Sequence, residues 1–305
     1  MLAGLFRRRH VPLVGVDVGT RTIAVVQAGA GFKVEGVAEV ETPPGAVHEG
    51  QVLDARLLGA AIREALRTAK VTARSAVLAV PAQYGFLRQV TFPPMPLKEL
   101  RATVDLQPER YIPLSREGSV YDVQILPGLN GDGQMTAVLA AAPRRQVADL
   151  MAASREAGLR PVRVDLEPLA LHRALMAAGE AQREATVVLV DLGATGAKIS
   201  LFAGDLPLIT RVVEMSGTED LFVDIRRSLE FAITQSGAHP SRVFVGGGGG
   251  TDAYMLIALT GYLRSFLAGR LPADFQVEPL RGGALGLEPS QMLAFGLSVA
   301  PEMLS

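Results

Sequence analysis

The sequence contains no cysteine and only four histidines among its 305 residues. The lack of cysteine excludes disulfide bonds, a thiolate nucleophile and cysteine-ligated metal sites. The histidines, at positions 10, 48, 172 and 239, do not have the spacing that metal ligands usually have, so we interpret them as packed or solvated side chains. Neither thiol chemistry nor a histidine metal centre is therefore expected.

The chain also lacks an excess of charge and a long apolar run. Its 30 lysines and arginines and 31 aspartates and glutamates give a net charge of −1, which does not indicate binding to nucleic acid or anionic lipid. A membrane span needs about 20 predominantly apolar residues, and the apolar runs here are shorter or are interrupted. In residues 1–10 the charges follow the apolar part, the reverse of a secretory signal. We therefore expect a cytoplasmic protein without a span, and a frayed start that could alternatively touch a membrane surface.

Two similar segments are the most informative feature that is present. Residues 14–26 are VGVDVGTRTIAVV and residues 188–201 are VLVDLGATGAKISL. Each consists of an apolar strand, a tight turn with Asp, Gly and a hydroxyl group, and a second apolar strand. Asp17 and Asp191 are 191 − 17 = 174 residues apart, which is too far for a solenoid repeat and suits two related domains.

A third glycine-rich turn, GGGGGT at 246–251, lies between a predicted strand at 242–245 and a predicted helix at 253–268. Backbone N–H groups there, with the helix dipole, form a natural anion site or a flat floor under a base. Each turn alone is also common as a simple hairpin or flexible loop. The three together, each after an apolar strand, favour a nucleotide cleft with Asp17 and Asp191 near its metal ion.

The wider pattern predicts an α/β protein in which strands followed by a helix occur twice, with an α+β insert between the two sets. The first set is expected at 13–18, 22–28, 32–40 and 53–68. The second set is expected at 186–191, 197–203, 207–214 and 220–236. The predicted divisions are 1–71 and 161–185 for the core of lobe one, 72–160 for the insert, and 186–305 for the core of lobe two.

Several segments of the chain resemble those of a known protein family. The hairpins resemble the phosphate loops, and the glycine run the adenosine loop, of the actin–Hsp70–sugar kinase superfamily. VTFPPMP at 90–96 with ERYIP at 109–113 is similar to the insert of the type IV pilus assembly protein PilM family, a relative of FtsA. So are VDLEPLALHRA at 164–174 and DIRRSLEF at 224–231. The resemblance covers most of the chain and implies an actin-like (ribonuclease H-like) two-lobed fold with an α+β insert in lobe one.

The resemblance also implies a site for ATP and Mg²⁺ between the lobes. Asp17 and Asp191 would position the metal, and Glu167 corresponds to an acidic residue near the metal-bound water in several members. No residue is assigned as catalytic beyond that possible role of Glu167. The residues expected to bind the nucleotide are Gly19, Thr20, Arg21, Gly193, Thr195, Gly246, Gly247, Gly248 and Gly249.

Two departures from the family predict a weak or degenerate ATP site. Family members usually carry lysine near the position of Ala24. Lys198, on the matching strand of the second half, could partly substitute for that lysine, although we interpret it as a surface lysine. Residues 214–220 lead almost directly into a helix where the family has a subdomain that helps to hold ribose and adenine. Any ATPase activity is therefore expected to be weak or absent.

The function implied by the resemblance is a cytoplasmic scaffold of the type IV pilus inner-membrane platform, with roles in twitching motility and natural transformation. It would bind the N-terminal cytoplasmic tail of PilN, and through PilN it would contact PilO and the pilus motor platform indirectly, so it would be peripheral at the inner membrane. An extended peptide gains backbone hydrogen bonds and side-chain pockets in such a groove. The proposed groove residues, each of which could instead belong to the insert core, are Tyr84, Phe86, Phe92, Met95 and Tyr111.

Two other functions remain as alternatives. An ATP-dependent kinase or other ATPase of the superfamily would need a general base and a closed cleft, and the sequence has no distinct sugar-binding signature. A filament-forming protein would need the stacking surfaces that the lost subdomain normally supplies. The sequence leaves open whether the machine serves pili, secretion or DNA uptake.

Overall fold

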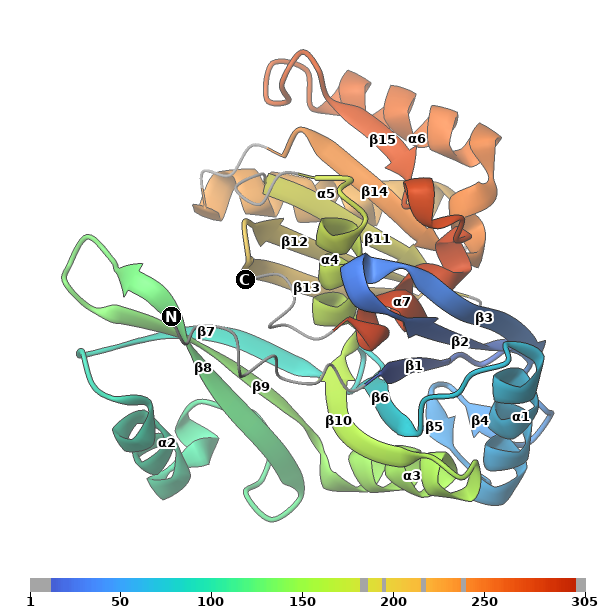
Figure 1. Cartoon of the computed structure of the whole chain (residues 1–305). Coiled ribbons are helices and arrows are strands. Elements are labelled where there is room, and N and C mark those ends of the chain that lie inside the picture. The colour runs from blue at the N-terminus through green and yellow to red at the C-terminus, as the bar shows by residue number, and fades with distance from the viewer. Residues whose placement is uncertain (1–11, 182–185, 194–195, 215–217, 237–239, 300–305) are drawn as a thin grey trace, which may run out of the picture.

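The computed structural model describes residues 12–181, 186–193, 196–214, 218–236 and 240–299. Two lobes, each built on a five-stranded mixed sheet, lie against each other, and a smaller three-stranded sheet projects to one side (Figure 1). Helices cover the sheets and also fill the space between the two lobes. The α/β class and the two-lobed architecture are therefore as predicted.

The sheet of lobe one has the strand order β10-β6-β1-β2-β3. Strands β1 (Leu13–Val18), β2 (Thr22–Ala28) and β3 (Val34–Glu41) form the predicted antiparallel meander. Strands β6 (Ser75–Val80) and β10 (Arg160–Leu166) extend it in parallel from β1. A small hairpin, β4 (Val47–His48) and β5 (Gln51–Val52), precedes the first helix.

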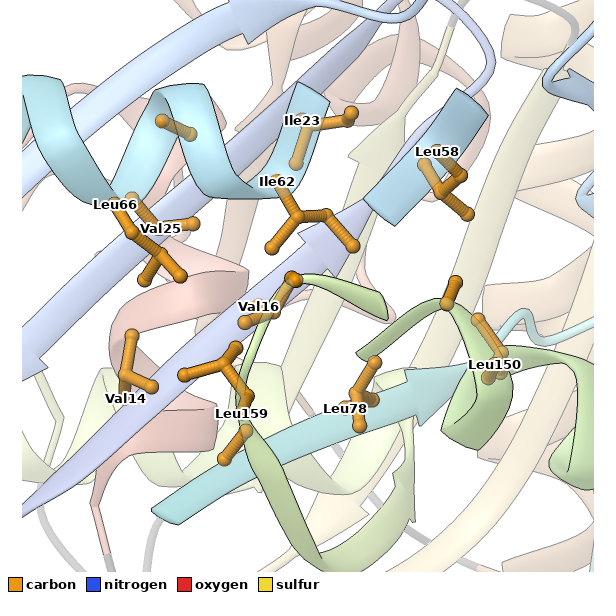
Figure 2. Close-up of a cluster of buried hydrophobic side chains, with 14 of the residues drawn as sticks. Val14, Val16, Ile23, Val25, Leu58, Ile62, Leu66, Leu78, Leu150 and Leu159 are labelled. Atoms are coloured by element: carbon orange, nitrogen blue, oxygen red, sulfur yellow. The ribbon is translucent and has the colours of Figure 1, made fainter. Parts of the chain in front are cut away.

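Helices α1 (Ala55–Thr68) and α3 (Arg144–Glu156) cover one face of this sheet. The side chain of Asp54 caps α1 by accepting hydrogen bonds from the backbone N–H groups of Arg56 and Leu57. Apolar residues at three- and four-residue spacing place one buried face of α1 on the sheet. Figure 2 shows side chains of β1, β2, β6, α1 and α3 packed into this core, among them Val16, Leu78 and Leu150.

Lobe two repeats the topology of lobe one. Its strands are β11 (Thr186–Leu192), β12 (Gly196–Ala203), β13 (Leu206–Glu214), β14 (Arg242–Gly247) and β15 (Gln276–Pro279). Their order is β13-β12-β11-β14-β15, so in both sheets the first strand is central, with the second and third on one side of it. Helices α5 (Thr218–Ser236) and α6 (Ala253–Phe266) supply the core of this lobe. Only residues 215–217 separate β13 from α5, which leaves no room for a subdomain there.

The two lobes meet at helices α4 (Glu167–Ala177) and α7 (Met292–Ser298). Residues of both sheets pack around this helix pair in one buried cluster. The contact is close because glycines lie in it: a Cβ at Gly296 would be 1.8 Å from the carbonyl oxygen of Ala170, and a Cβ at Gly15 would be 1.8 Å from that of Ala294. Larger residues at these positions would separate the elements.

The inserted subdomain, called the insert below, spans 86–143. It consists of β7 (Phe86–Phe92), α2 (Leu97–Leu106), β8 (Ser119–Leu129) and β9 (Met135–Pro143), with the strand order β7-β9-β8. A short 3₁₀ helix at Pro108–Arg110 follows α2, which ends before Pro108 because proline cannot continue its backbone hydrogen bonds.

The predicted insert boundaries at 72 and 160 need correction. Strand β6 pairs in parallel with β1 and therefore belongs to the sheet of lobe one. Helix α3 buries Leu150 and Ala153 in the lobe-one core rather than in the insert. Both elements lie next to the insert in sequence, but their apolar side chains are buried in the core of lobe one.

Three further 3₁₀ helices lie in loops, at Ala30–Phe32, Gly248–Thr251 and Gly283–Leu285, and a fourth at Pro289–Gln291 leads into α7. Among the helices described by the structure, none combines the length and apolar character needed to cross a membrane.

Candidate nucleotide cleft and insert surface

A cavity of about 810 Å³ lies between the lobes. The turns of the two related hairpins, the start of α4 and the end of β14 line it. Its volume is in the range of pockets that bind ligands of nucleotide size, roughly 300–1,000 Å³. The structure thus brings the two predicted phosphate turns and part of the glycine run to one cleft.

The first hairpin places Asp17, Thr20 and Arg21 at this cleft. The backbone N–H of Gly19 donates to the carbonyl oxygen of Thr22 at 2.9 Å, which closes the turn. Thr42 anchors the turn from β3's end, because its hydroxyl donates to the carbonyl oxygen of Gly19 at 2.8 Å. The amide of Gly19 therefore serves the hairpin itself, although Gly19 also lines the cleft.

The second hairpin has the same construction. The N–H of Gly193 donates to the carbonyl oxygen of Gly196 at 2.9 Å, and Gly193 lines the cleft. Thr195, predicted to bind phosphate, lies outside the described residues. In each hairpin the aspartate pairs across the strands with a residue seven positions later: Asp17 with Ala24, and Asp191 with Lys198. Lys198 is thus the counterpart of Ala24 in the other lobe.

The predicted adenosine loop begins within β14 and continues in the 3₁₀ helix that follows. Gly246 and Gly247 end β14, while Gly248 and Gly249 belong to the 3₁₀ helix. Gly247 and Gly248 line the cleft. Gly247 has a φ of +72°, and a Cβ on it would lie 2.5 Å from Oδ1 of Asp191. Glycine is therefore required here for the close approach of β14 to the second aspartate.

Lys198 is not the surface lysine that we expected. Its Nζ lies 2.8 Å from Oε2 of Glu167 and 3.3 Å from Oδ2 of Asp191, and only 21% of its side chain is exposed. Oε2 of Glu167 also accepts a hydrogen bond from the backbone N–H of Ala82 at 2.8 Å. Because Glu167 opens α4 and Lys198 lies in β12, this ion pair joins lobe one to lobe two across the cleft. The sequence signal that could have indicated this buried position is the equal spacing: Lys198 follows Asp191 by seven residues, as Ala24 follows Asp17.

The electrostatics of the cleft follow from this burial. Burial raises the pKa of Asp17 well above its usual range, and the nearby Glu167 and Asp191 raise it further. Burial also raises the pKa of Glu167, although Lys198 opposes that shift. For Lys198, burial alone would lower the pKa, but Glu167 and Asp191 outweigh it and raise the pKa. The lysine is therefore charged throughout the physiological range.

The cleft carries more negative than positive charge. Of the described residues that line it, two are basic, Arg21 and Lys198. Five are acidic: Asp17, Glu39, Glu49, Glu167 and Asp191. A nucleotide polyphosphate would meet this excess of carboxylates, which is unfavourable unless a cation balances them.

The cleft fits a nucleotide in volume, but its residues do not fit Mg²⁺ at Asp191. Magnesium needs near-octahedral oxygen ligands at about 2.1 Å, and the Lys198 ammonium already contacts the carboxylates of Asp191 and Glu167. Over the described part of the chain, no group of three or more His, Asp or Glu side chains is arranged to hold a metal.

The predicted groove residues fall in two places. Phe92 is 4% exposed, and its ring centroid lies 5.4 Å from that of Tyr111 inside the insert core. Phe86, Met95 and Tyr111 are half-buried against the same core. Tyr84 instead packs on the core of lobe one and lines the cleft. Its hydroxyl donates to the carbonyl oxygen of Glu49 at 3.1 Å and accepts from Nε2 of Gln51 at 2.8 Å.

The repeated sheets, the helix pair between them and the cleft define an actin-like α/β protein with two lobes. The sequence model of the family described as type IV pilus assembly protein PilM matches residues 15–249, more than two thirds of the chain. The chain therefore belongs to the PilM family.

Solved structures support the same fold. A chain of a PilM–PilN type IV pilus biogenesis complex is similar with a TM-score of 0.79 and 26% identity, covering 96% of this chain and 98% of that one. The cytoplasmic domain of EpsL, from the type II secretion system of Vibrio cholerae, has a TM-score of 0.55 and 13% identity, with coverages of 96% and 98%. A ROK family glucokinase from Streptomyces griseus, in complex with glucose and AMPPNP, has a TM-score of 0.53 and 15% identity, with coverages of 95% and 99%.

Proposed function

We propose that this protein is a scaffold of the type IV pilus assembly platform and that it binds the N-terminal cytoplasmic tail of a PilN protein. The observation that carries the proposal is the similarity to the PilM–PilN complex, at 26% identity over 96% of this chain. The protein would act on the cytoplasmic side, and the tail would hold it at the inner membrane. PilO and the pilus motor platform would be indirect partners through PilN.

The insert and the adjoining part of lobe one are the proposed docking surface. Phe86, Met95 and Tyr111 offer partly exposed apolar surface there, and Phe92 supports them from below. Tyr84 lies where lobe one continues into β7, next to the insert. Such a surface suits an extended peptide, which would gain backbone hydrogen bonds and pockets for alternate side chains.

Calorimetry with a synthetic PilN tail peptide and the full-length protein tests the proposal, with a scrambled peptide as the control. Removal of an aromatic anchor from a peptide groove costs about 2 kcal/mol or more, roughly thirtyfold in affinity. We therefore expect Tyr111→Ala and Tyr84→Ala to weaken binding while the protein stays folded. Asp191→Ala, in the cleft, should barely affect it.

The adaptor function is contradicted if the intact protein does not bind the tail peptide. Equal loss of folding and binding in the tyrosine variants, followed by circular dichroism, would mean that these tyrosines are core residues. The groove would then lie elsewhere on the surface.

We further propose that the ATP site is weak or degenerate. Three features support this: Ala24 in place of a lysine, the excess of acidic residues in the cleft and the three-residue link between β13 and α5. If ATP binds, we propose that Gly19, Thr20, Arg21 and Gly193 meet its phosphates and that Gly247 and Gly248 face its adenosine, since these residues all line the cleft. Submicromolar ATP affinity, or steady ATP turnover that Asp17→Ala abolishes, would favour the alternative of a kinase or other ATPase.

A further inference from the structure

We propose that Lys198 takes the place of a divalent cation in the cleft, so that its ammonium group keeps such a cation out. This goes beyond the proposed scaffold function, because it concerns the charge balance of the cleft whether or not a tail peptide binds. It begins from the disagreement between the residues present and the Mg²⁺ that an actin-like cleft implies.

The position of the ammonium group is the first argument. Nζ lies between Oε2 of Glu167 and Oδ2 of Asp191, at 2.8 and 3.3 Å. A divalent cation bound to the same two oxygens at about 2.1 Å would contact the ammonium directly and would be repelled by it. The two cations are therefore mutually exclusive at this place.

The rigidity of the three groups is the second argument. Lys198 lies in the middle strand of a triplet, paired with Asp191 of β11 and Val212 of β13. Glu167 is held by the N–H of Ala82, and its side chain is 8% exposed. Gly247 lies near the other carboxylate oxygen of Asp191, since a Cβ on Gly247 would be 2.5 Å from Oδ1. The two carboxylates consequently form a fixed binding position for the ammonium, and the Lys198 side chain loses little further conformational entropy there.

The charge of the cluster is the third argument. Asp17, Glu167 and Asp191 all line the same cleft, and Nζ of Lys198 contacts the carboxylates of the last two. Ala24, the counterpart of Lys198 in lobe one, adds no charge. Without Lys198 the three carboxylates would form an uncompensated, buried anionic site that suits a divalent cation.

Mn²⁺ titration of the full-length protein, followed by electron paramagnetic resonance, tests the proposal. The variants are Lys198→Met, which keeps the length of the side chain without its charge, and Lys198→Arg, which keeps the charge. We expect Lys198→Met to gain one bound Mn²⁺, with an affinity at least about tenfold above that of wild type. The gain should disappear in the double variant Lys198→Met/Asp191→Asn, and Lys198→Arg should behave as wild type.

The proposal is overturned if wild type binds a cleft Mn²⁺ as tightly as Lys198→Met, or if Lys198→Met gains no Mn²⁺ affinity while it stays folded. If Lys198→Met fails to fold, Mn²⁺ binding by wild type is compared with Mn²⁺ binding by Asp191→Asn. Equal Mn²⁺ binding by those two supports exclusion by Lys198, and a Mn²⁺ that only wild type binds contradicts it. Neither result bears on peptide capture, which calorimetry measures separately.

Discussion

At the scale of single residues, the cleft combines one buried cation with several buried carboxylates. Asp17 lies one residue before the end of β1, where burial, Glu167 and Asp191 all disfavour its charged form. The Lys198 ammonium opposes these effects for Asp17, but it directly contacts only the other two carboxylates. Ionisation of Asp17 therefore lowers the free energy of unfolding of the protein.

We expect Asp17→Asn to stabilise the protein at neutral pH. The raised pKa means that the folded state binds the Asp17 proton more tightly than the unfolded state, in which the pKa is about 4. Stability due to this group is therefore full below that unfolded value and declines as pH rises toward the folded pKa. The amide removes the decline, so the gain in urea midpoint over wild type should grow as pH rises from acid to neutral.

The matched control for this prediction is Asp132→Asn, an exposed residue in the β8–β9 turn. It should change the urea midpoint little at any of these pH values. A pH-independent effect of Asp17→Asn, or a loss of stability at neutral pH, would contradict the electrostatic account.

Gly247 gives a second prediction at this scale. Gly247→Ala combines a left-handed φ with a Cβ only 2.5 Å from Asp191 Oδ1 and from the carbonyl oxygen of Leu192. Gly269→Ala has a similar φ of +76°, but no atom within 4 Å of its Cβ. We expect Gly269→Ala to cost about 1–2 kcal/mol from the backbone alone. Gly247→Ala should cost clearly more in chemical unfolding, and equal costs would mean that the end of β14 can shift away from Asp191 without a penalty.

At the scale of elements, the α4–α7 pair is the centre of the molecule. Its residues and those of both sheets share one buried cluster, which also contains Phe202 and Phe244 of lobe two. Gly296 lets the backbones of α7 and α4 come into contact. Arg173 of α4 donates to the carbonyl oxygen of Gly296 at 3.2 Å and pairs with Asp165, so polar contacts accompany the close packing.

We expect Gly296→Ala to destabilise the protein by about 3 kcal/mol or more, because the new methyl group overlaps the carbonyl oxygen of Ala170 and cannot be accommodated without separating the helices. Gly261→Ala in α6 is the matched control. Its Cβ would meet no atom within 4 Å, and alanine is the better helix former by about 1 kcal/mol. Thermal unfolding of both variants should therefore give changes of opposite sign. A tolerated Gly296→Ala would contradict the close packing of the pair.

At the scale of the whole molecule, the insert is the part of lobe one that has no counterpart in the described part of lobe two. The insert begins and ends in lobe one, yet it also touches lobe two, where Nε2 of Gln89 in β7 donates to the carbonyl oxygen of Pro207 in β13 at 2.5 Å. Strand β13 in turn lines the cleft through Val212 and Val213. Strand β13 thus contacts both the proposed peptide-binding subdomain and the cleft.

We expect Gln89→Ala to cost about 1 kcal/mol of stability, the usual worth of one hydrogen bond. It should also increase amide hydrogen exchange in β7 and β13, because the insert would be held to lobe two by fewer contacts. Gln124→Ala on the exposed side of β8 should leave exchange in β13 unchanged. Unchanged exchange in Gln89→Ala would show that this contact does not hold the insert to lobe two.

Much of this fold could be predicted because its signals are local. The hairpin turns around Gly19 and Gly193 are encoded by the residues within them, and the caps and apolar faces of helices such as α1 are equally local. The repetition of one hairpin after 174 residues was enough to indicate two related lobes, and the insert motif indicated the family. These features could be predicted because the residues that determine them are close together in the sequence.

Two features were decided only by the tertiary structure. One is that β6 and α3, at the insert boundary, belong to lobe one, and the other is that Lys198 forms buried ion pairs. Ser75 of β6 pairs with Leu13 and with Arg160, residues far away on either side in sequence. Lys198 meets Glu167 from the other lobe, so its charge is balanced only after the lobes have come together. Strand pairing and the pairing of buried charges depend on which distant groups become neighbours, and the pattern of the chain alone does not specify that.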